Sequence, residues 1–168
     1  MRRAAAIAVV LMALVSTACG RRAEFVCEKG GFAVWIPASY ARDRARAAAL
    51  QIAEQTSTVF LFEDEDPRYA YTVAYFDDWL PGGDARSALA AARDRAVQAL
   101  GAKIASEKVV ELNGHPGLHV EVDGPKRFDM RMYFVKGRLY QMAFVFSKGH
   151  FSPEREDRFF GSFRLLGD

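Results

Sequence analysis

Residues 103–147 read KIASEKVVELNGHPGLHVEVDGPKRFDMRMYFVKGRLYQMAFVFS, and they set the architecture of the chain. Two dipeptides in this run, Asn113-Gly114 and Lys136-Gly137, are typical of tight turns between antiparallel strands. Leu118–Val122 and Phe128–Phe134 alternate apolar and polar residues with a period of two, which indicates strands with one buried face. We therefore predict four antiparallel strands over this stretch.

Leu139–Phe146, the last run of the stretch, is apolar at nearly every position. A strand with apolar side chains on both faces belongs inside a sheet that is covered on two sides. Two predicted helices provide the cover. The first, at about 84–100, has a capping aspartate at its start and Gly101 just past its end. The second, at about 152–163, starts with Ser152-Pro153.

Several segments in the first half of the chain are also predicted to form strands. Phe32–Pro37 has apolar residues on one face, and Phe25–Glu28 precedes it across a pair of glycines, as a hairpin partner or a lead-in. Tyr69–Phe76 is rich in aromatic and β-branched residues. Between them we expect a surface segment over Ser39–Ala47 and strands over Leu50–Phe62.

The acidic run Glu63–Asp66 separates two of these strands. Calcium prefers carboxylate oxygens, but the run lacks the glycine and the ligand spacing of a calcium-binding loop. We therefore expect a solvated turn whose charges discourage pairing between sheet edges.

Five basic residues cluster in the strand region: Lys126, Arg127, Arg131, Lys136 and Arg138. Such a cluster could contact anionic lipid headgroups or an acidic partner. We expect a solvated outer face instead, with Asp129 and Glu121 as cross-strand partners.

The first 18 residues have the composition of an export signal. Arg2-Arg3 precede an apolar run, Ala4–Val15, that is too short for a comfortable membrane span. Cys19 then follows small residues, as in bacterial lipoprotein signals, in which this cysteine becomes the lipidated first residue. Ser16 stands where those signals usually carry leucine, so plain secretion after cleavage at residue 18 is the alternative. The expected parts are a signal peptide (1–18), a tether (19–24) and a single domain (25–168).

Cys27 is the second of the two cysteines. If Cys19 is lipidated, Cys27 stands alone, whereas a free Cys19 would allow a disulfide between them in an oxidising compartment. A catalytic thiol needs a nearby base and a lowered pKa, and nothing local supplies either. We expect a structural thiol.

The charge of the mature chain argues against nucleic-acid binding. The chain has 23 Lys and Arg and 21 Asp and Glu residues. Removing the signal takes away two arginines, which leaves a balanced charge. Nucleic-acid affinity rests largely on phosphate neutralisation by an excess of basic residues. We therefore expect no nucleic-acid partner.

His115 and His119 are the best candidates for a metal or catalytic site, with His150 as a third member if its loop comes near. Residues four apart on a strand lie about 13 Å apart along it, which is too far for one metal ion unless a turn intervenes. Zinc needs three or four ligands in tight geometry. The chain also has no nucleophile elbow, phosphate loop or dinucleotide fingerprint. We predict no catalytic residue, no metal ligand and no cofactor.

Four local phrases carry a resemblance: Ala70–Val73, Leu112–Gly117, Arg138–Gln141 and Phe159–Phe163. With the order of predicted elements, they resemble small exported bacterial domains similar to the PsbP-like fold of the photosystem II extrinsic proteins. The resemblance extends over residues 32–166. It implies an α+β fold, an α/β/α sandwich around a mostly antiparallel sheet of about six to seven strands. It implies no reaction and no site residues, because members of this fold serve as accessory or binding modules.

Three functions are consistent with these observations. The favoured one is a non-enzymatic accessory or interaction module of the bacterial cell envelope, anchored to the membrane by a lipid on Cys19, with an envelope protein as partner. The alternative is a periplasmic carrier of a small apolar ligand or lipid, with a pocket lined by Phe and Met residues. An enzyme would need His115, His119 and an acid to converge in a cleft.

Overall fold

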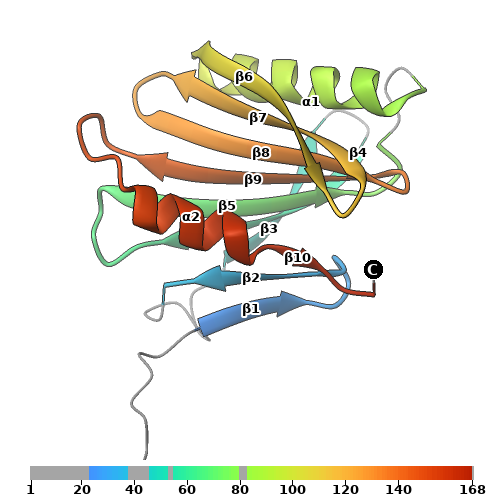
Figure 1. Ribbon diagram of the computed structural model, residues 1–168, viewed down its shortest axis with the longest axis horizontal. Coiled ribbons are helices and arrows are strands. Elements are labelled where there is room, and N and C mark those ends of the chain that lie inside the picture. The colour runs from blue at the N-terminus through green and yellow to red at the C-terminus, as the bar shows by residue number, and fades with distance from the viewer. Residues whose placement is uncertain (1–22, 38–45, 53–54, 80–82, 168) are drawn as a thin grey trace, which may run out of the picture.

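The computed structural model describes residues 23–37, 46–52, 55–79 and 83–167. These residues form ten strands and two helices (Figure 1). The bounds are β1 Ala23–Cys27, β2 Phe32–Ile36, β3 Arg46–Ile52, β4 Gln55–Glu63, β5 Tyr69–Phe76, α1 Ala85–Leu100, β6 Lys103–Leu112, β7 His115–Asp123, β8 Arg127–Val135, β9 Arg138–Phe146, α2 Pro153–Ser162 and β10 Arg164–Leu165.

The main sheet contains seven of the described strands, all antiparallel to their neighbours, in the order β3-β4-β5-β9-β8-β7-β6. The four strands predicted over residues 103–147 are confirmed. β9 lies between β5 and β8, which agrees with its apolar side chains on both faces. β6 is at one edge, and a register shift between Ile104 and Ser106 interrupts its pairing with β7.

Two tight turns fix the register of this sheet. Asn113 and Gly114 have φ values of 51° and 82°, and Lys136 and Gly137 have values of 49° and 87°. Positive φ at both central residues is the conformation whose twist matches paired antiparallel strands. A one-residue shift in register would move every side chain of a strand to the opposite face of the sheet. These turns therefore decide which side chains face which helix.

A second, smaller sheet has the order β1-β2-β10 within the described residues. β1 and β2 form a hairpin, which was one of the two arrangements considered for these segments, but its separation from the main sheet and its pairing with β10 were not predicted. β10 contributes only Arg164 and Leu165, opposite Ala33 and Phe32. Two residues carry no periodic pattern, so tertiary contacts and not local sequence define this strand.

The predicted α+β sandwich is confirmed. α1 packs on β7 and β8 on one face of the main sheet, whereas α2 contacts β9 and β2 on the opposite face. Figure 1 shows α2 and the small sheet on the same side. An aromatic core fills that side, with Phe32, Phe62 and Phe144 fully buried, and a second core lies under α1 around Ala88 and Leu89.

The caps of α1 agree with the prediction. The Asp84 carboxylate accepts a hydrogen bond from the Ser87 N–H at 2.9 Å, and Gly101 adopts φ 57° just past the helix end. Trp79 covers the helix entrance, where its indole N–H donates to the Ala88 carbonyl at 3.0 Å. This contact makes Trp79 part of the core edge.

Two expectations for residues 39–66 are corrected. The strand expected from Leu50 begins at Arg46, because pairing with β4 overrides the helix propensity of this alanine-rich segment. Residues 38–45 and 53–54 lie outside the described residues. Within the acidic run, Asp64 is buried and not solvated.

Asp64 is buried because two partners from other elements hold its carboxylate. The Tyr71 hydroxyl donates to it at 3.1 Å, and the Arg155 guanidinium of α2 forms a close ion pair with it. Burial raises the pKa of Tyr71 to about 12. The acidic run therefore anchors the start of α2 to the main sheet.

Candidate functional site

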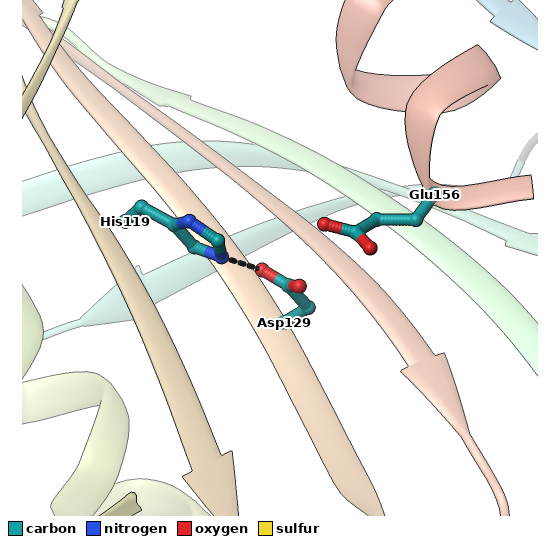
Figure 2. A group of neighbouring side chains, drawn as sticks. All are labelled: His119, Asp129 and Glu156. Atoms are coloured by element: carbon teal, nitrogen blue, oxygen red, sulfur yellow. Dashed lines mark hydrogen bonds and ion pairs between the residues drawn. The ribbon is translucent and has the colours of Figure 1, made fainter. Parts of the chain in front are cut away.

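Three polar side chains from three separate elements meet under α2. His119 comes from β7, Asp129 from β8 and Glu156 from the first turns of α2. In the strand register His119 lies opposite Arg131, and Asp129 lies opposite Glu121, so the histidine and aspartate are diagonal neighbours on one face. Figure 2 shows the His119 ring and the two carboxylates pointing toward one another.

The cluster is compact and largely removed from water. One potential ligand atom from each of His119, Asp129 and Glu156 lies within 4.8 Å of the other two. His119 and Asp129 are each 5% exposed, and the Glu156 side chain is 13% exposed. Nε2 of His119 contacts Oδ1 of Asp129, while Nδ1 of His119 has no hydrogen-bond partner in the described part of the chain. A buried polar atom without a partner is uncommon and calls for an explanation.

The electrostatics of the cluster centre on Glu156. Burial raises the pKa of the Glu156 carboxyl to about 7, and the adjacent Asp129 carboxylate adds to the rise through a hydrogen bond and charge repulsion. Arg131 opposes this rise, with its guanidinium 3.7 Å from the Glu156 carboxylate and stacked 4.4 Å over the Phe160 ring. Glu156 is therefore partly protonated near neutral pH when no cation lies beside it.

A cavity of about 640 Å³ opens onto the cluster, and its lining includes His119, Asp129 and Glu156. Cavities of roughly 300–1,000 Å³ hold small ligands in proteins. The three side chains are therefore buried in the protein but accessible from the cavity.

The donor set fits a divalent transition-metal ion. Imidazole nitrogen and carboxylate oxygens bind zinc at about 2.0–2.2 Å, so tetrahedral donors lie roughly 3.3–3.6 Å apart. In this structure the three donor atoms lie within 4.8 Å of one another, and Nε2 of His119 is in direct hydrogen-bond contact with Oδ1 of Asp129, so a cation would enter by displacing that contact. A cation would also displace the proton from Glu156, and a tetrahedral ion held by three protein ligands would keep a fourth position open to the cavity.

The sequence singled out His119 as a candidate beside His115 and His150, although no metal ligand was predicted. The structure joins it to Asp129 and Glu156, neither of which was proposed as a ligand. His115 starts β7 at the hairpin, and His150 lies beside the Arg68 guanidinium, with Nδ1 at 3.2 Å from it. The cluster therefore contains one histidine and two acids.

The predicted basic outer face is corrected. Arg131 lies beneath α2, and Arg138 donates to the Asp77 carboxylate at 2.6 Å. Asp129 is not a solvated cross-strand partner but a buried neighbour of His119. Glu121 does face a base, with Arg127 at 3.9 Å.

Of the two cysteines, Cys27 lies within the described residues and Cys19 lies outside them. Cys27 is half-buried, and its sulfur accepts a hydrogen bond from the Gly30 N–H at 3.2 Å. This contact agrees with a structural thiol.

Raising the pH is expected to destabilise the cation-free protein through Glu156. The folded state holds the Glu156 proton up to about pH 7, whereas the unfolded chain releases it near its ordinary pKa of 4.5. The stabilisation is therefore complete below pH 4.5 and is lost as the pH rises through 7. Urea unfolding in EDTA at pH 5 and pH 8 should show this loss, and Glu156→Gln should remove that part of the change in unfolding free energy with pH.

Glu154→Gln, on an exposed side chain of the same helix, is the control and should keep the wild-type dependence of unfolding free energy on pH. An identical dependence in wild type and Glu156→Gln would contradict the prediction.

No family model matches the chain, and no curated protein matches it. Among solved structures, it is similar to cyanobacterial PsbP (CyanoP) from Synechocystis sp. PCC 6803, with a TM-score of 0.60 and 12% identity over 89% of this chain and 96% of that one. It also matches PA94, a protein of unknown function from Pseudomonas aeruginosa, with a TM-score of 0.43 and 10% identity over 77% of this chain and 85% of that one. The similarity to CyanoP shows a PsbP-like fold and confirms the fold resemblance in the sequence.

Proposed function

We propose that the chain is a non-enzymatic accessory module of the bacterial cell envelope that binds a divalent transition-metal ion through His119, Asp129 and Glu156. The observation that carries the proposal is the meeting of these three largely buried side chains in the lining of a cavity. Imidazole favours transition metals over calcium and magnesium, which prefer all-oxygen ligand sets. The PsbP-like fold is the setting of this site.

The carrier of a small apolar ligand is the weaker candidate. Its predicted pocket would be lined by Phe and Met side chains. Met130, Met132 and Met142 are instead closely packed in the two cores. The cavity at the cluster has charged residues over much of its lining. An apolar ligand alone would leave those charges without compensation.

Zinc titration tests the proposed site directly. Wild-type protein is expected to bind one Zn²⁺ per chain in competition with a chromophoric chelator. Loss of a residue that only hydrogen-bonds a metal ligand costs roughly 10–100-fold in metal affinity. His119→Gln removes a ligand itself, so it should weaken zinc binding by at least this much. His115→Gln, on the same strand, is the matched control and should bind as the wild type does. Equal zinc affinity in all three proteins would refute the site.

The envelope location has its own support and its own test. The export-type N-terminus with Cys19 supports a lipid anchor. Among the described residues, no helix has the length and apolar character to cross a membrane. Intact mass of the protein from host membranes should show a lipid-sized excess that Cys19→Ala abolishes and Cys27→Ala retains. A plain mass starting at residue 19 would indicate a secreted protein.

A further inference from the structure

The charge of the cavity depends on whether a cation is bound. Four acids and three bases line it together with His119: Glu121, Asp123, Asp129, Glu156, Lys108, Arg127 and Lys148. Their formal charges sum to −1 with all four acids ionised and to 0 with Glu156 protonated, and a divalent cation beside four ionised acids would make the sum +1. Opposite charges attract strongly where water is partly excluded. The cavity should therefore attract an anion only when the cation is in place.

Lys108 is the base in the lining that has no ion-pair partner among the described residues. Lys148 and Arg127 are engaged by Asp123, at 3.0 Å and 3.5 Å. Lys108 lies directly opposite His119 in the pairing of β6 with β7. Directly opposed side chains have Cβ atoms about 4.5–5.5 Å apart, so the Lys108 ammonium can reach the space above the cluster.

An aromatic surface completes the cavity. Phe146 and Phe151 both line it, and their ring centroids are 5.3 Å apart. Phe151 is 52% exposed, although most large apolar side chains of the described residues are buried. An exposed aromatic ring at the mouth of a cavity is a natural contact for an apolar part of a ligand.

We propose that the cation-loaded cavity binds a small organic carboxylate that carries an apolar group. The inference rests on the proposed function, because the cation supplies the positive charge and the open coordination position. One carboxylate oxygen completes the coordination that three protein ligands leave open, and Lys108 donates a hydrogen bond to the carboxylate. The apolar group packs against Phe151. The proposal is reversible binding alone, without any chemical change of the ligand.

Phenylacetate is a suitable probe because it combines a carboxylate with a ring, and two relatives separate these features. Acetate retains the carboxylate, and 2-phenylethanol retains the ring without the charge. Calorimetric titration should show phenylacetate binding to zinc-loaded protein about tenfold or more tightly than either relative. The reason is that one charge-assisted hydrogen bond or one buried ring changes affinity by about tenfold or more. Protein in EDTA should bind phenylacetate at least about tenfold more weakly.

Two variants with matched controls test the contacts. Lys108→Met should weaken phenylacetate binding roughly tenfold, and Lys103→Met, on the same strand outside the cavity, should not. Phe151→Ala should weaken phenylacetate but not acetate, whereas Val109→Ala, an exposed apolar residue elsewhere, should affect neither. Both variants should retain zinc affinity.

The two proposals fail in different ways. If zinc binds but phenylacetate does not, or if phenylacetate binds equally well in EDTA, the carboxylate site is overturned and the cation site stands. If zinc itself fails to bind, both are overturned. Unchanged phenylacetate affinity in Lys108→Met and Phe151→Ala would also overturn the assigned contacts and with them the inference.

Discussion

Saturating zinc is expected to raise the free energy of unfolding of the wild-type chain by about 2.7 kcal/mol when free zinc is 100 times its dissociation constant. The reason is that the three ligands belong to β7, β8 and α2, which are together only in the folded chain. For a chain of this size the corresponding rise in the thermal midpoint is about 5–10 °C. Scanning calorimetry with zinc and then with excess EDTA measures the rise and its reversal.

Asp129→Asn should abolish most of this stabilisation, because an amide cannot supply the charged oxygen that the cation needs. Asp123→Asn is the matched control. Asp123 lines the same cavity but is 46% exposed and is not among the three ligands. The control should respond to zinc as the wild type does. A zinc response that survives in Asp129→Asn would contradict the assignment of Asp129 as a ligand.

Phe32→Ala is expected to destabilise the protein by about 3–5 kcal/mol, the usual cost of removing a buried aromatic side chain. Phe32 is fully buried where the small sheet meets the main one. Its ring lies 5.6 Å from that of Phe163, 6.1 Å from Phe60 and 6.2 Å from Tyr140. The change therefore leaves a cavity where the two sheets meet.

Urea unfolding in EDTA measures this cost. Phe151→Ala is the control, since Phe151 is half-exposed and its loss should change stability far less. Phe32→Leu should lie between the two, because it retains much of the buried volume. Equal stability of Phe32→Ala and Phe151→Ala would show that the small sheet contributes little to the fold.

Much of the fold could be predicted because its signals are local. Asn113-Gly114 and Lys136-Gly137 adopt the positive φ values that such turns require, and these turns place the intervening strands in register. Asp84 and Gly101 likewise fix the ends of α1 through backbone geometry. These features depend on a few neighbouring residues, so sequence alone specifies them.

The early start of β3 and the whole of β10 were not predicted, because both depend on distant partners. β3 lies in an alanine-rich segment whose propensity favours a helix, and only pairing with β4 makes it a strand. β10 is too short for any period and exists because Phe32 and Ala33 lie opposite it. In both cases the deciding contact is tertiary.

The candidate site was missed for a related reason. Asp129 alternates with apolar residues in β8, and this pattern was interpreted as a solvated face. The predicted sandwich has helices on both faces, however, so polar side chains under α2 had to be buried. That contradiction was the available signal. The meeting of Asp129 with His119 depends on strand register, and that of Glu156 depends on where α2 lies.

The pairing of β2 with the last strand also affects when the chain can finish folding. The Trp35 N–H donates to the Ser162 hydroxyl across 127 positions of sequence, and the Leu166 N–H donates to the Gly31 carbonyl. The small sheet thus brings residues 23–36 together with residues 164–165, and contacts of such long range form slowly. A chain that emerges from the ribosome amino end first cannot complete this sheet until residues 164–166 are free. Up to that moment Phe32 and Ala33 lack their β10 partners, so the domain cannot finish folding while it is being synthesised up to that point.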